Sequence, residues 1–349
     1  MTDKPIINRR TVLTGAGVVA AAATTQMAQA QPAAAPAAAP PTPALGGGQP
    51  TAPLFWTTET TNGKVQGMAN GEIKEFKGIP YGAPTGGPNR YMPTKKPAAW
   101  AGVRECHAFS QISPQTLSAL GSEYGRLICW DRHNDGGMGE DCLTVNVWTP
   151  SVDKSAKKAV MVSFHGGGWA TGSGNGIGYD GAELSRFGDV VVVTVTHRLG
   201  TFGYLNLIDL GAPSDFKYAG VCGVMDMVAS LQWVKDNIEN FGGDPNRVMI
   251  FGQSGGGAKN SVLMGTPAAR GLFHRAGIQS GSTLRLGDKA AAARGAETLL
   301  AKLNIPKNDI ARIQRLTWQE ILQAGGSGSP VMDGDYLPHH PFDPGAPAE

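Results

Sequence analysis

The amino-acid sequence has 349 residues, of which 41% are hydrophobic, so the chain can bury one large core or two smaller ones. The formal net charge is +2, and the first ten residues account for it, with Lys4, Arg9 and Arg10 against Asp3. The rest of the chain is close to neutral, so composition gives no support to a nucleic-acid partner. Outside the N-terminal segment no apolar run reaches the length of a membrane span, about 18 residues, and no integral membrane segment is expected there.

The N-terminal segment has the composition of an export signal. Arg9 and Arg10 precede a weakly apolar stretch over 12–23, and a small-x-small cleavage site ends at Ala30. A basic region, an apolar core and a small-residue site are typical of a secretory signal, and the paired arginines indicate the twin-arginine type. Residues 1–30 are thus predicted to be a signal peptide that directs the protein to the periplasm or the medium. A disordered Ala-rich tail is the alternative.

The folded part of the chain is expected to begin near Phe55. Residues 31–54 are mostly Ala, Pro, Gly and Thr, and such a segment cannot bury enough apolar surface to offset the entropy of ordering it. They are predicted to form an extended linker that precedes a folded domain over 55–349.

Within this domain, strand and helix patterns alternate along the chain. Near its start, residues 64–67 and 73–79 are predicted to pair as a small antiparallel hairpin, with Asn70 and Gly71 as the turn. The apolar pattern then predicts strands at 160–165 and 189–196, a helix at 223–241, a strand at 247–252, a helix from 255, a strand at 276–280 and a helix at 290–303. Strands that alternate with helices indicate a mostly parallel sheet with helices on both faces, so the expected fold class is α/β.

Two glycine-containing turns carry the signal for catalysis. Residues 252–256, GQSGG, match G-x-S-x-G and lie between a predicted strand and a predicted helix, where a tight turn would expose the hydroxyl of Ser254. Residues 165–169, HGGGW, also follow a strand, and glycines there let backbone N–H groups bind the oxyanion of a tetrahedral intermediate. Either segment alone is also compatible with an ordinary glycine-rich loop. Their occurrence together, in this order, favours acyl transfer by a serine nucleophile.

The sequence does not indicate phosphate, dinucleotide or metal chemistry. G-x-x-x-x-G-K-[ST] is not present, and GIGYDG at 176–181 matches G-x-G-x-x-G in letters only, because it does not directly follow a predicted strand. No Cys/His spacing is typical of a metal site. No cofactor is therefore expected.

Longer segments around these turns resemble a known family. Residues 241–256, FGGDPNRVMIFGQSGG, resemble the serine signature of the type-B carboxylesterases, the family that includes the cholinesterases. Residues 140–150, EDCLTVNVWTP, resemble its second signature, and FKGIPY at 76–81 and RLG at 198–200 add shorter similarities. The resemblance implies an α/β-hydrolase fold. It also implies a serine carboxylic-ester hydrolase that acts on a small-molecule ester through an acyl-enzyme.

The functional residues of the family carry over onto matching positions of this chain. Ser254 corresponds to the nucleophile, and Gly167, Gly168 and Gly255 correspond to the residues whose N–H groups form the oxyanion hole. Ser280 corresponds to a serine that supports the acid of the catalytic triad.

The chain also departs from the family pattern. Gln253 stands where the residue before the serine is commonly Glu, and Gly255 replaces the usual Ala. Val221 and Met227 stand where Asn and Gln are usual.

A serine nucleophile needs a base and an acid, and the Glu and His of the family have no matching positions in this chain. The chain is therefore expected to be the N-terminal part of an esterase, and to be inactive and poorly stable by itself. A substitute triad of His339 or His340 with Asp333 or Asp335 is the alternative to an ordinary polar surface segment. For function, the alternative is a non-catalytic α/β-hydrolase-fold module used for binding or adhesion.

Four cysteines are available for disulfides in an exported chain: Cys106, Cys129, Cys142 and Cys222. Ser113 stands where the family has the cysteine partner of Cys142. Cys142 is expected to be bridged, with Cys106 or Cys129 as its partner, whereas Cys222 is expected to be a buried thiol.

The resemblance implies two further contacts. Arg90 precedes Tyr91, Met92 and Pro93 and is expected to pair with Glu140 of the second signature. Trp169 follows the oxyanion glycines, and it is expected either to line the pocket or to belong to the core.

Overall fold

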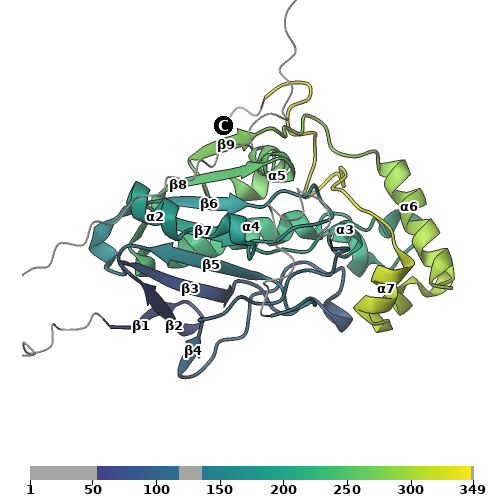
Figure 1. Cartoon of the computed structure of the whole chain (residues 1–349). Helices are drawn as coiled ribbons and strands as arrows, with labels where there is room; N and C mark the ends of the chain where they lie inside the picture. The colour runs from purple at the N-terminus through teal and green to yellow at the C-terminus, as the bar shows by residue number, and fades with distance from the viewer. Residues whose placement is uncertain (1–52, 118–135, 347–349) are drawn as a thin grey trace, which may run out of the picture. The chain divides into compact units, whose positions relative to one another are not determined.

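The computed structural model describes residues 53–117 and 136–346, and its main feature there is a nine-stranded mixed sheet (Figure 1). The strands follow the order β1-β2-β3-β5-β7-β6-β8-β9, and β4 pairs with β2. They are β1 (Phe55–Thr60), β2 (Gly63–Asn70), β3 (Ile73–Pro80), β4 (Val103–Glu105), β5 (Thr144–Thr149), β6 (Lys158–Phe164), β7 (Val191–Val195), β8 (Gly243–Gln253) and β9 (Arg275–Gln279). The helices are α2 (Ala182–Gly188), α3 (Gly200–Gly203), α4 (Cys222–Asn237), α5 (Gly255–Met264), α6 (Lys289–Lys302) and α7 (Trp318–Ala324). None of these described helices combines the length and the apolarity that a membrane span requires.

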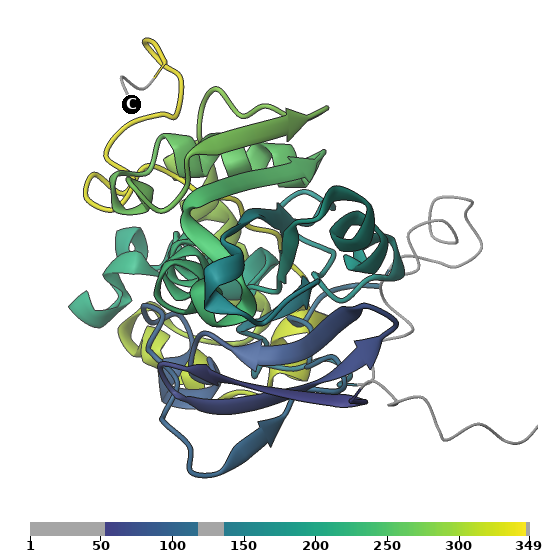
Figure 2. The ribbon, with the colours of Figure 1, turned by 90° about the vertical axis from the view of Figure 1, so that its left-hand side faces the viewer.

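The sheet is parallel in one half and antiparallel in the other. From β7 through β6 and β8 to β9 all strands are parallel. On the other side of β7, the strands β5, β3, β2 and β1 pair antiparallel in turn. Figure 2 shows these two halves, with the purple N-terminal strands at one side of the sheet and the green β8 and β9 at the other. The predicted parallel sheet is therefore confirmed in the half that carries Ser254.

The N-terminal hairpin forms between β2 and β3 as predicted, but its turn lies one residue later. Asn70 pairs with Ile73, so Gly71 and Glu72 occupy the turn. Gly71 has a φ of 59°, in the left-handed region that two-residue hairpin turns need and that glycine adopts at low cost.

The strands and helices predicted between β6 and α6 are all present, with ends that shift by a few residues. The helix predicted at 223–241 ends as α4 at Asn237, and a short 3₁₀ helix (Ile238–Phe241) continues it. Gly242, with a φ of 72°, terminates this 3₁₀ helix, as predicted from the glycine pair.

One face of the parallel strands packs against α4. Val162 of β6 lies in register with Val193 of β7 on one side and with Ile250 of β8 on the other. All three are buried in one cluster with Val224 and Leu231 of α4. Because burying an aliphatic side chain of this size contributes about 1.5–3 kcal/mol, this row holds α4 on the sheet.

The opposite face is covered by α2. Successive residues of a strand point to opposite faces, so Val192 of β7 points away from α4. It packs in a buried cluster with Ile73, Trp148 and Ala182, the last of which belongs to α2. Helices thus lie on both faces of the sheet, as predicted.

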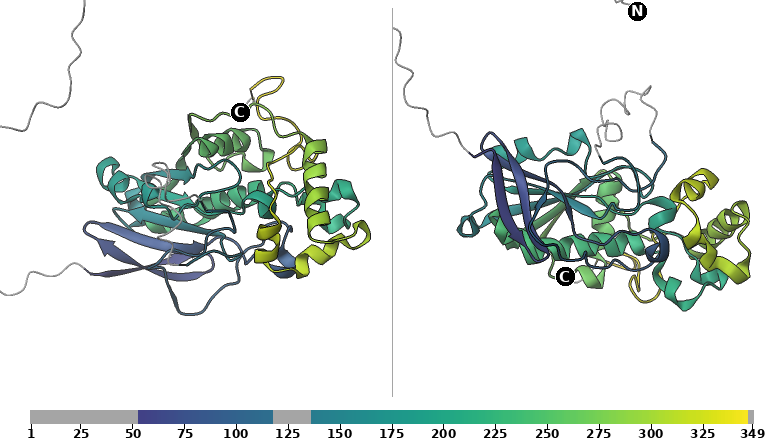
Figure 3. Two further views of the ribbon diagram at one scale, coloured as in Figure 1. Left: turned by 45° about the vertical axis from the view of Figure 1, so that its right-hand side comes forward. Right: turned by 90° about the horizontal axis from the view of Figure 1, so that it is seen from below.

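A second apolar cluster lies at the side of the sheet away from α2, where Figures 1 and 3 show α6 and α7. Leu299 of α6 and Ile321 of α7 are buried there with Phe202 of α3 and Ile313 of a 3₁₀ helix (Lys307–Arg315). Tyr91 completes the cluster from the N-terminal third of the domain.

The predicted ion pair between Arg90 and Glu140 is confirmed. Arg90 Nε donates to Glu140 Oε1 and Nη2 donates to Oε2, both at 2.6 Å, which is the bidentate geometry of a strong pair. The remaining guanidinium nitrogen, Nη1, donates to Ile313 O at 2.8 Å and to Leu316 O at 2.7 Å. Arg90 therefore joins the second signature to the 3₁₀ helix of the second cluster.

The expected bridge between Cys142 and Cys106 is wrong, because both are buried free thiols in the structure. The backbone of Cys106 accepts a hydrogen bond from Lys77 N, whereas Leu143, next to Cys142, accepts one from Tyr81 N. Lys77 lies in β3 and Tyr81 just after it, so the segments that carry the two cysteines bind at different points of the chain, whereas a disulfide needs Cα atoms within about 7 Å.

The other cysteine predictions have separate outcomes. Cys222 is a buried thiol, as predicted, and burial raises its pKa to about 11, so it stays protonated. Cys129 lies outside the described residues. Ser113, at the position of the family's cysteine, accepts a hydrogen bond from Leu199 N at 3.1 Å.

Candidate active site

Ser254 lies at the turn between β8 and α5, where the sequence predicts an exposed nucleophile. Its φ of 56° and ψ of −120° place a non-glycine residue in a conformation that costs about 1–3 kcal/mol. A backbone hydrogen bond from Ser254 N to Gln279 O, 2.8 Å long, ties the turn to the end of β9. The neighbouring strand thus helps to maintain the strained turn.

Glycines surround Ser254 because backbone segments approach closely there. A Cβ on Gly256 would lie 2.1 Å from Phe164 O, at the end of β6, and one on Gly252 would lie 2.4 Å from the same atom. A Cβ on Gly281 would lie 2.0 Å from Ser254 O. No side chain fits at these distances, so the start of α5 packs directly on the end of β6.

The glycine-rich segment that the sequence predicts to bind the oxyanion follows β6. Gly167 and Gly168 have φ values of 88° and 61°, in the region that favours glycine. Gly167 O accepts a hydrogen bond from Thr171 N at 3.1 Å, and Gly166 N donates to Tyr179 Oη at 2.8 Å. These contacts close the loop on itself. We refer to residues 166–168 as the oxyanion loop.

The oxyanion loop meets the serine turn at Gly168 and Gly255. A Cβ on Gly255 would lie 2.3 Å from Gly168 N and 2.5 Å from Gly168 Cα. Glycine at 255, where the family commonly has Ala, is what permits this approach. Within the described part of the chain, the N–H groups of Gly167, Gly168 and Gly255 donate to no acceptor. The three predicted donors are therefore brought close to Ser254 and are available to a negatively charged oxygen.

The other residues named from the family pattern lie around the turn. Ser280 follows β9 directly, has a φ of 50° and is exposed. Gln253 is exposed as well. Trp169 is partly buried and packs edge-on against the ring of Tyr204, with centroids 5.3 Å apart, so it lies at the margin of the core.

No described histidine or carboxylate forms a hydrogen bond with the Ser254 hydroxyl. The rings of His339 and His340 contact backbone groups of nearby residues. The carboxylate of Asp335 binds a lysine and a tyrosine, and that of Asp333 accepts from two backbone N–H groups. The substitute triad is therefore not assembled, and these side chains belong to a polar surface segment.

Behind the oxyanion loop lies a cluster of three buried ionisable side chains that sequence reasoning missed. Nζ of Lys259, on α5, donates to His165 O at 2.7 Å, and the His165 ring stacks on His197 with centroids 5.0 Å apart. Burial lowers the pKa of Lys259 to about 7 and that of His197 to about 3. Burial and the charge of Lys259 hold the pKa of His165 well below its usual range. The sequence feature that could have indicated this cluster is Lys259 itself, because it is the single charged residue of α5.

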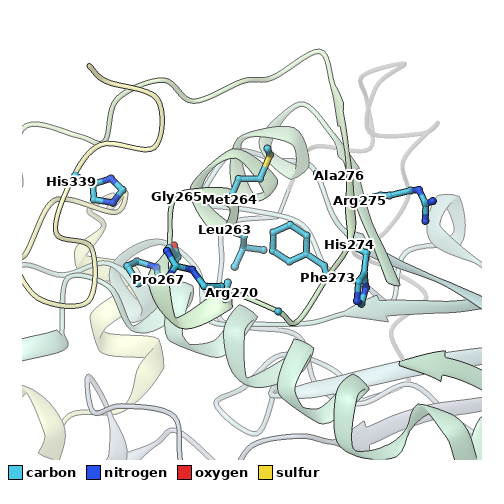
Figure 4. Close-up of a pocket in the computed structure, with 13 residues that line it drawn as sticks. Leu263, Met264, Gly265, Pro267, Arg270, Phe273, His274, Arg275, Ala276 and His339 are labelled. Atoms are coloured by element: carbon cyan, nitrogen blue, oxygen red, sulfur yellow. The ribbon is translucent and has the colours of Figure 1, made fainter. Parts of the chain in front are cut away.

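The cavity drawn in Figure 4 lies at the end of α5 opposite to Ser254. It has a volume of about 450 Å³, and His274 and His339 line it from opposite sides. Because α5 has ten residues, about 15 Å separate this cavity from the serine, and we assign it no part in the chemistry. A second cavity, of about 350 Å³, is lined by Gln253 and Gln279 on the α2 side of the turn.

A serine on a strained strand-to-helix turn, beside a glycine-rich loop that follows the neighbouring parallel strand, is the arrangement that defines the α/β-hydrolases. The profile of the carboxylesterase family matches residues 56–346, and the chain belongs to that family.

Characterised relatives are esterases and other ester-type hydrolases. The chain is 36% identical to the para-nitrobenzyl esterase of Bacillus subtilis over 265 residues, which are 76% of this chain and 51% of that protein. It is 35% identical to the human cocaine esterase over 311 residues, 85% of this chain and 54% of that protein. The chain thus spans about half the length of the curated relatives that it matches.

Solved structures agree with this assignment. A carboxylesterase of Geobacillus stearothermophilus matches with a TM-score of 0.74 and 37% identity, over 82% of this chain and 57% of that one. An esterase of Clostridium hathewayi, described as hydrolysing aliphatic aromatic polyesters, matches with a TM-score of 0.73 and 36% identity, over 84% and 59%.

Proposed function

We propose that the protein is a serine carboxylic-ester hydrolase that forms an acyl-enzyme on Ser254. The observation that carries this proposal is the contact between Gly168 and Gly255, which brings free N–H donors to a strained serine. Ser254 Oγ attacks the ester carbonyl, and the N–H groups bind the resulting oxyanion. Collapse of this intermediate expels the alcohol, which takes up the proton that the serine hydroxyl loses to a base. Water then hydrolyses the acyl-serine, releasing the carboxylic acid and restoring the hydroxyl. A purely non-catalytic binding module is not favoured, because both parts of this half-site are intact.

The base that activates Ser254 would lie outside the described residues. Of the described histidines, His165 and His197 are buried behind the oxyanion loop. The rings of His107, His274, His339 and His340 contact other groups: the Phe55 ring, Val248 N, His340 O and Leu286 N, respectively. None of them reaches the serine hydroxyl, and a serine without a base is a weak nucleophile at neutral pH.

The substrate class that fits is a small carboxylic ester. Relatives carry names that refer to para-nitrobenzyl esters, cocaine and phenmedipham, which share an ester-type carbonyl rather than one alcohol group. We therefore propose a general esterase. Gln253 supports a general esterase over an enzyme specialised for cationic choline esters, because it leaves no negative charge beside the nucleophile, where the family commonly has Glu.

The test is covalent labelling of the protein as its source cell makes it. A biotinylated fluorophosphonate is expected to modify the peptide that contains Ser254, as identified by mass spectrometry. Ser254→Ala should abolish labelling, and Ser155→Ala, at an exposed serine far along the chain, should not. Absence of a Ser254 adduct in a folded protein, with the probe active on a control esterase, would overturn the proposal.

For cellular location, we propose export by the twin-arginine route with cleavage after Ala30. The support is the Arg9–Arg10 pair ahead of a weakly apolar stretch. N-terminal sequencing of the mature protein should begin at Gln31, and replacing both arginines by lysine should leave the protein in the cytoplasm. A mature protein that still begins at residue 1 would contradict this assignment.

A further inference from the structure

The cluster behind the oxyanion loop has a feature that packing does not explain. Lys259 is completely buried, and within the described residues it forms no ion pair. Taking an ammonium group out of water without a counter-charge is costly, and a methionine of similar length would fill the space without that cost. The presence of the amine is therefore accounted for by what its N–H groups bind.

The acceptor of Lys259 is placed at the root of the oxyanion loop. Nζ donates to the carbonyl of His165, which is the residue between the end of β6 and Gly166. The same carbonyl belongs to the peptide unit that carries Gly166 N, and Gly166 N is itself fixed by Tyr179 Oη. Both ends of this peptide unit are therefore held, one residue before the predicted donor Gly167.

Lys259 and Ser254 share one rigid element. Ser254 precedes α5, and Lys259 lies on the second turn of the same helix. A bond from this helix to His165 O therefore sets the position of the oxyanion loop relative to the nucleophile. The charged form of an amine donates a stronger hydrogen bond than the neutral form.

We propose that Lys259 is a positioning residue for ester hydrolysis, which fixes the oxyanion loop against the Ser254 turn through its bond to His165 O. This inference rests on the proposed function, and it assigns to Lys259 no direct contact with substrate. Because the pKa of Lys259 is lowered to about 7, the bond weakens as the pH rises through neutrality. The ionisable groups that face it are His165 and His197, and the Arg198–Asp226 ion pair lies beyond His197.

The experiment compares loop dynamics and serine reactivity in matched variants of the protein as its source cell makes it. Lys259→Met removes the donor, Lys259→Gln keeps a neutral donor, and Lys235→Met makes the same change at an exposed lysine of α4. Hydrogen exchange is followed by mass spectrometry in a peptide over 165–172 and in reference peptides of β8 and α5. The rate of fluorophosphonate labelling at Ser254 is measured in parallel.

Lys259→Met is expected to accelerate exchange in the 165–172 peptide at least tenfold, with β8 unchanged, and to slow labelling at least tenfold. Both rates of Lys259→Gln, exchange in the 165–172 peptide and labelling at Ser254, should lie between those of Lys259→Met and those of the unchanged protein. Both rates of Lys235→Met should equal those of the unchanged protein. Loop exchange and labelling in Lys259→Met equal to those of Lys235→Met would overturn the proposal.

Lys259→Gln covers the case in which Lys259→Met does not fold. Exchange in 165–172 and labelling of Lys259→Gln equal to those of Lys235→Met would then overturn the proposal. In the unchanged protein, the ratio of exchange in 165–172 to exchange in β8 is expected to rise between pH 6 and pH 8.5. If Ser254 of the unchanged protein is not labelled at all, the esterase proposal fails, while the exchange data still decide the role of Lys259.

Discussion

At the scale of single residues, the strained backbone of Ser254 has a measurable cost. Glycine adopts a φ of 56° without the steric strain that serine or alanine meets. Ser254→Gly is therefore expected to be more stable than Ser254→Ala by about 1 kcal/mol, after allowing for the greater entropy of glycine in the unfolded chain. Urea unfolding followed by circular dichroism measures the difference. Equal midpoints would show that the surrounding structure has relieved the strain.

The contact of Gly255 with Gly168 gives a second prediction. Gly255→Ala puts a Cβ 2.3 Å from Gly168 N, so the oxyanion loop must move away from the serine. We expect fluorophosphonate labelling of Ser254 to slow about 10²-fold, as when an oxyanion donor is lost. Gly295→Ala is the matched control, because no atom lies within 4 Å of the added Cβ on the exposed face of α6. This control should label normally and gain about 0.5–1 kcal/mol of stability.

Lys259 predicts a pH dependence of folding. Its pKa is about 7 in the folded protein and near its ordinary value of 10.5 in the unfolded chain. Between these two values the unfolded chain binds more protons, so this group adds stability as the pH rises from about 7 to about 10.5 and adds no slope below 7. The free energy of unfolding, relative to that of Lys259→Met, should rise by at most about 1.4 kcal/mol per pH unit in this window. A constant difference in urea titrations at pH 6, 8 and 9.5 would contradict the lowered pKa.

At the scale of elements, the bidentate pair of Arg90 and Glu140 connects distant parts of the fold. Arg90 is only 3% exposed, so Arg90→Met leaves the Glu140 carboxylate, whose side chain is 12% exposed, without its partner. Breaking such a pair from one side costs about 3–5 kcal/mol. Arg186→Met, at an exposed ion pair on α2, should cost less than about 1 kcal/mol and serves as control. Similar losses for both variants in urea unfolding would contradict the importance of the buried pair.

Elements with a clear period or a glycine boundary could be predicted from the sequence. The helix α4 follows from its three- and four-residue apolar spacing, and Gly242 marks the end of its 3₁₀ extension. β5 could not be found by alternation, because all six of its residues are buried. α3 has four residues and β4 has three, which is too short for a periodic signal. Their positions depend on tertiary packing.

The candidate site also contains residues that could be predicted from the sequence and one that could not. The serine turn and the glycine loop depend on local backbone conformations, which glycine reveals in the sequence, so Ser254, Gly167, Gly168 and Gly255 could be named in advance. Lys259 could not, because its burial depends on how α5 packs against the end of β6, and no local pattern specifies that contact.

At the scale of the whole molecule, β9 is an edge within the described residues, since it pairs there only with β8. Ile278 on this strand is 36% exposed, and an open edge with an exposed apolar residue favours strand pairing between copies. The 349-residue chain is expected to self-associate with increasing concentration, and Ile278→Lys should reduce this association in sedimentation experiments. Ile177→Lys, at an exposed isoleucine outside the sheet, is the control and should have no effect. Equal association of both variants would show that β9 is not the contact.

The hydrogen-bond acceptors of Arg90 become available at different times while the chain is being synthesised. Its hydrogen bond to Ile313 O joins residues 223 positions apart in the chain. Ribosomes add roughly 5–20 residues per second, so Ile313 is synthesised on the order of ten seconds or more after Arg90. Glu140, only 50 positions later, becomes available much sooner and can neutralise the guanidinium during the interval. The carboxylate that stabilises the finished protein thus also protects the nascent chain from an unpaired charge in its forming core.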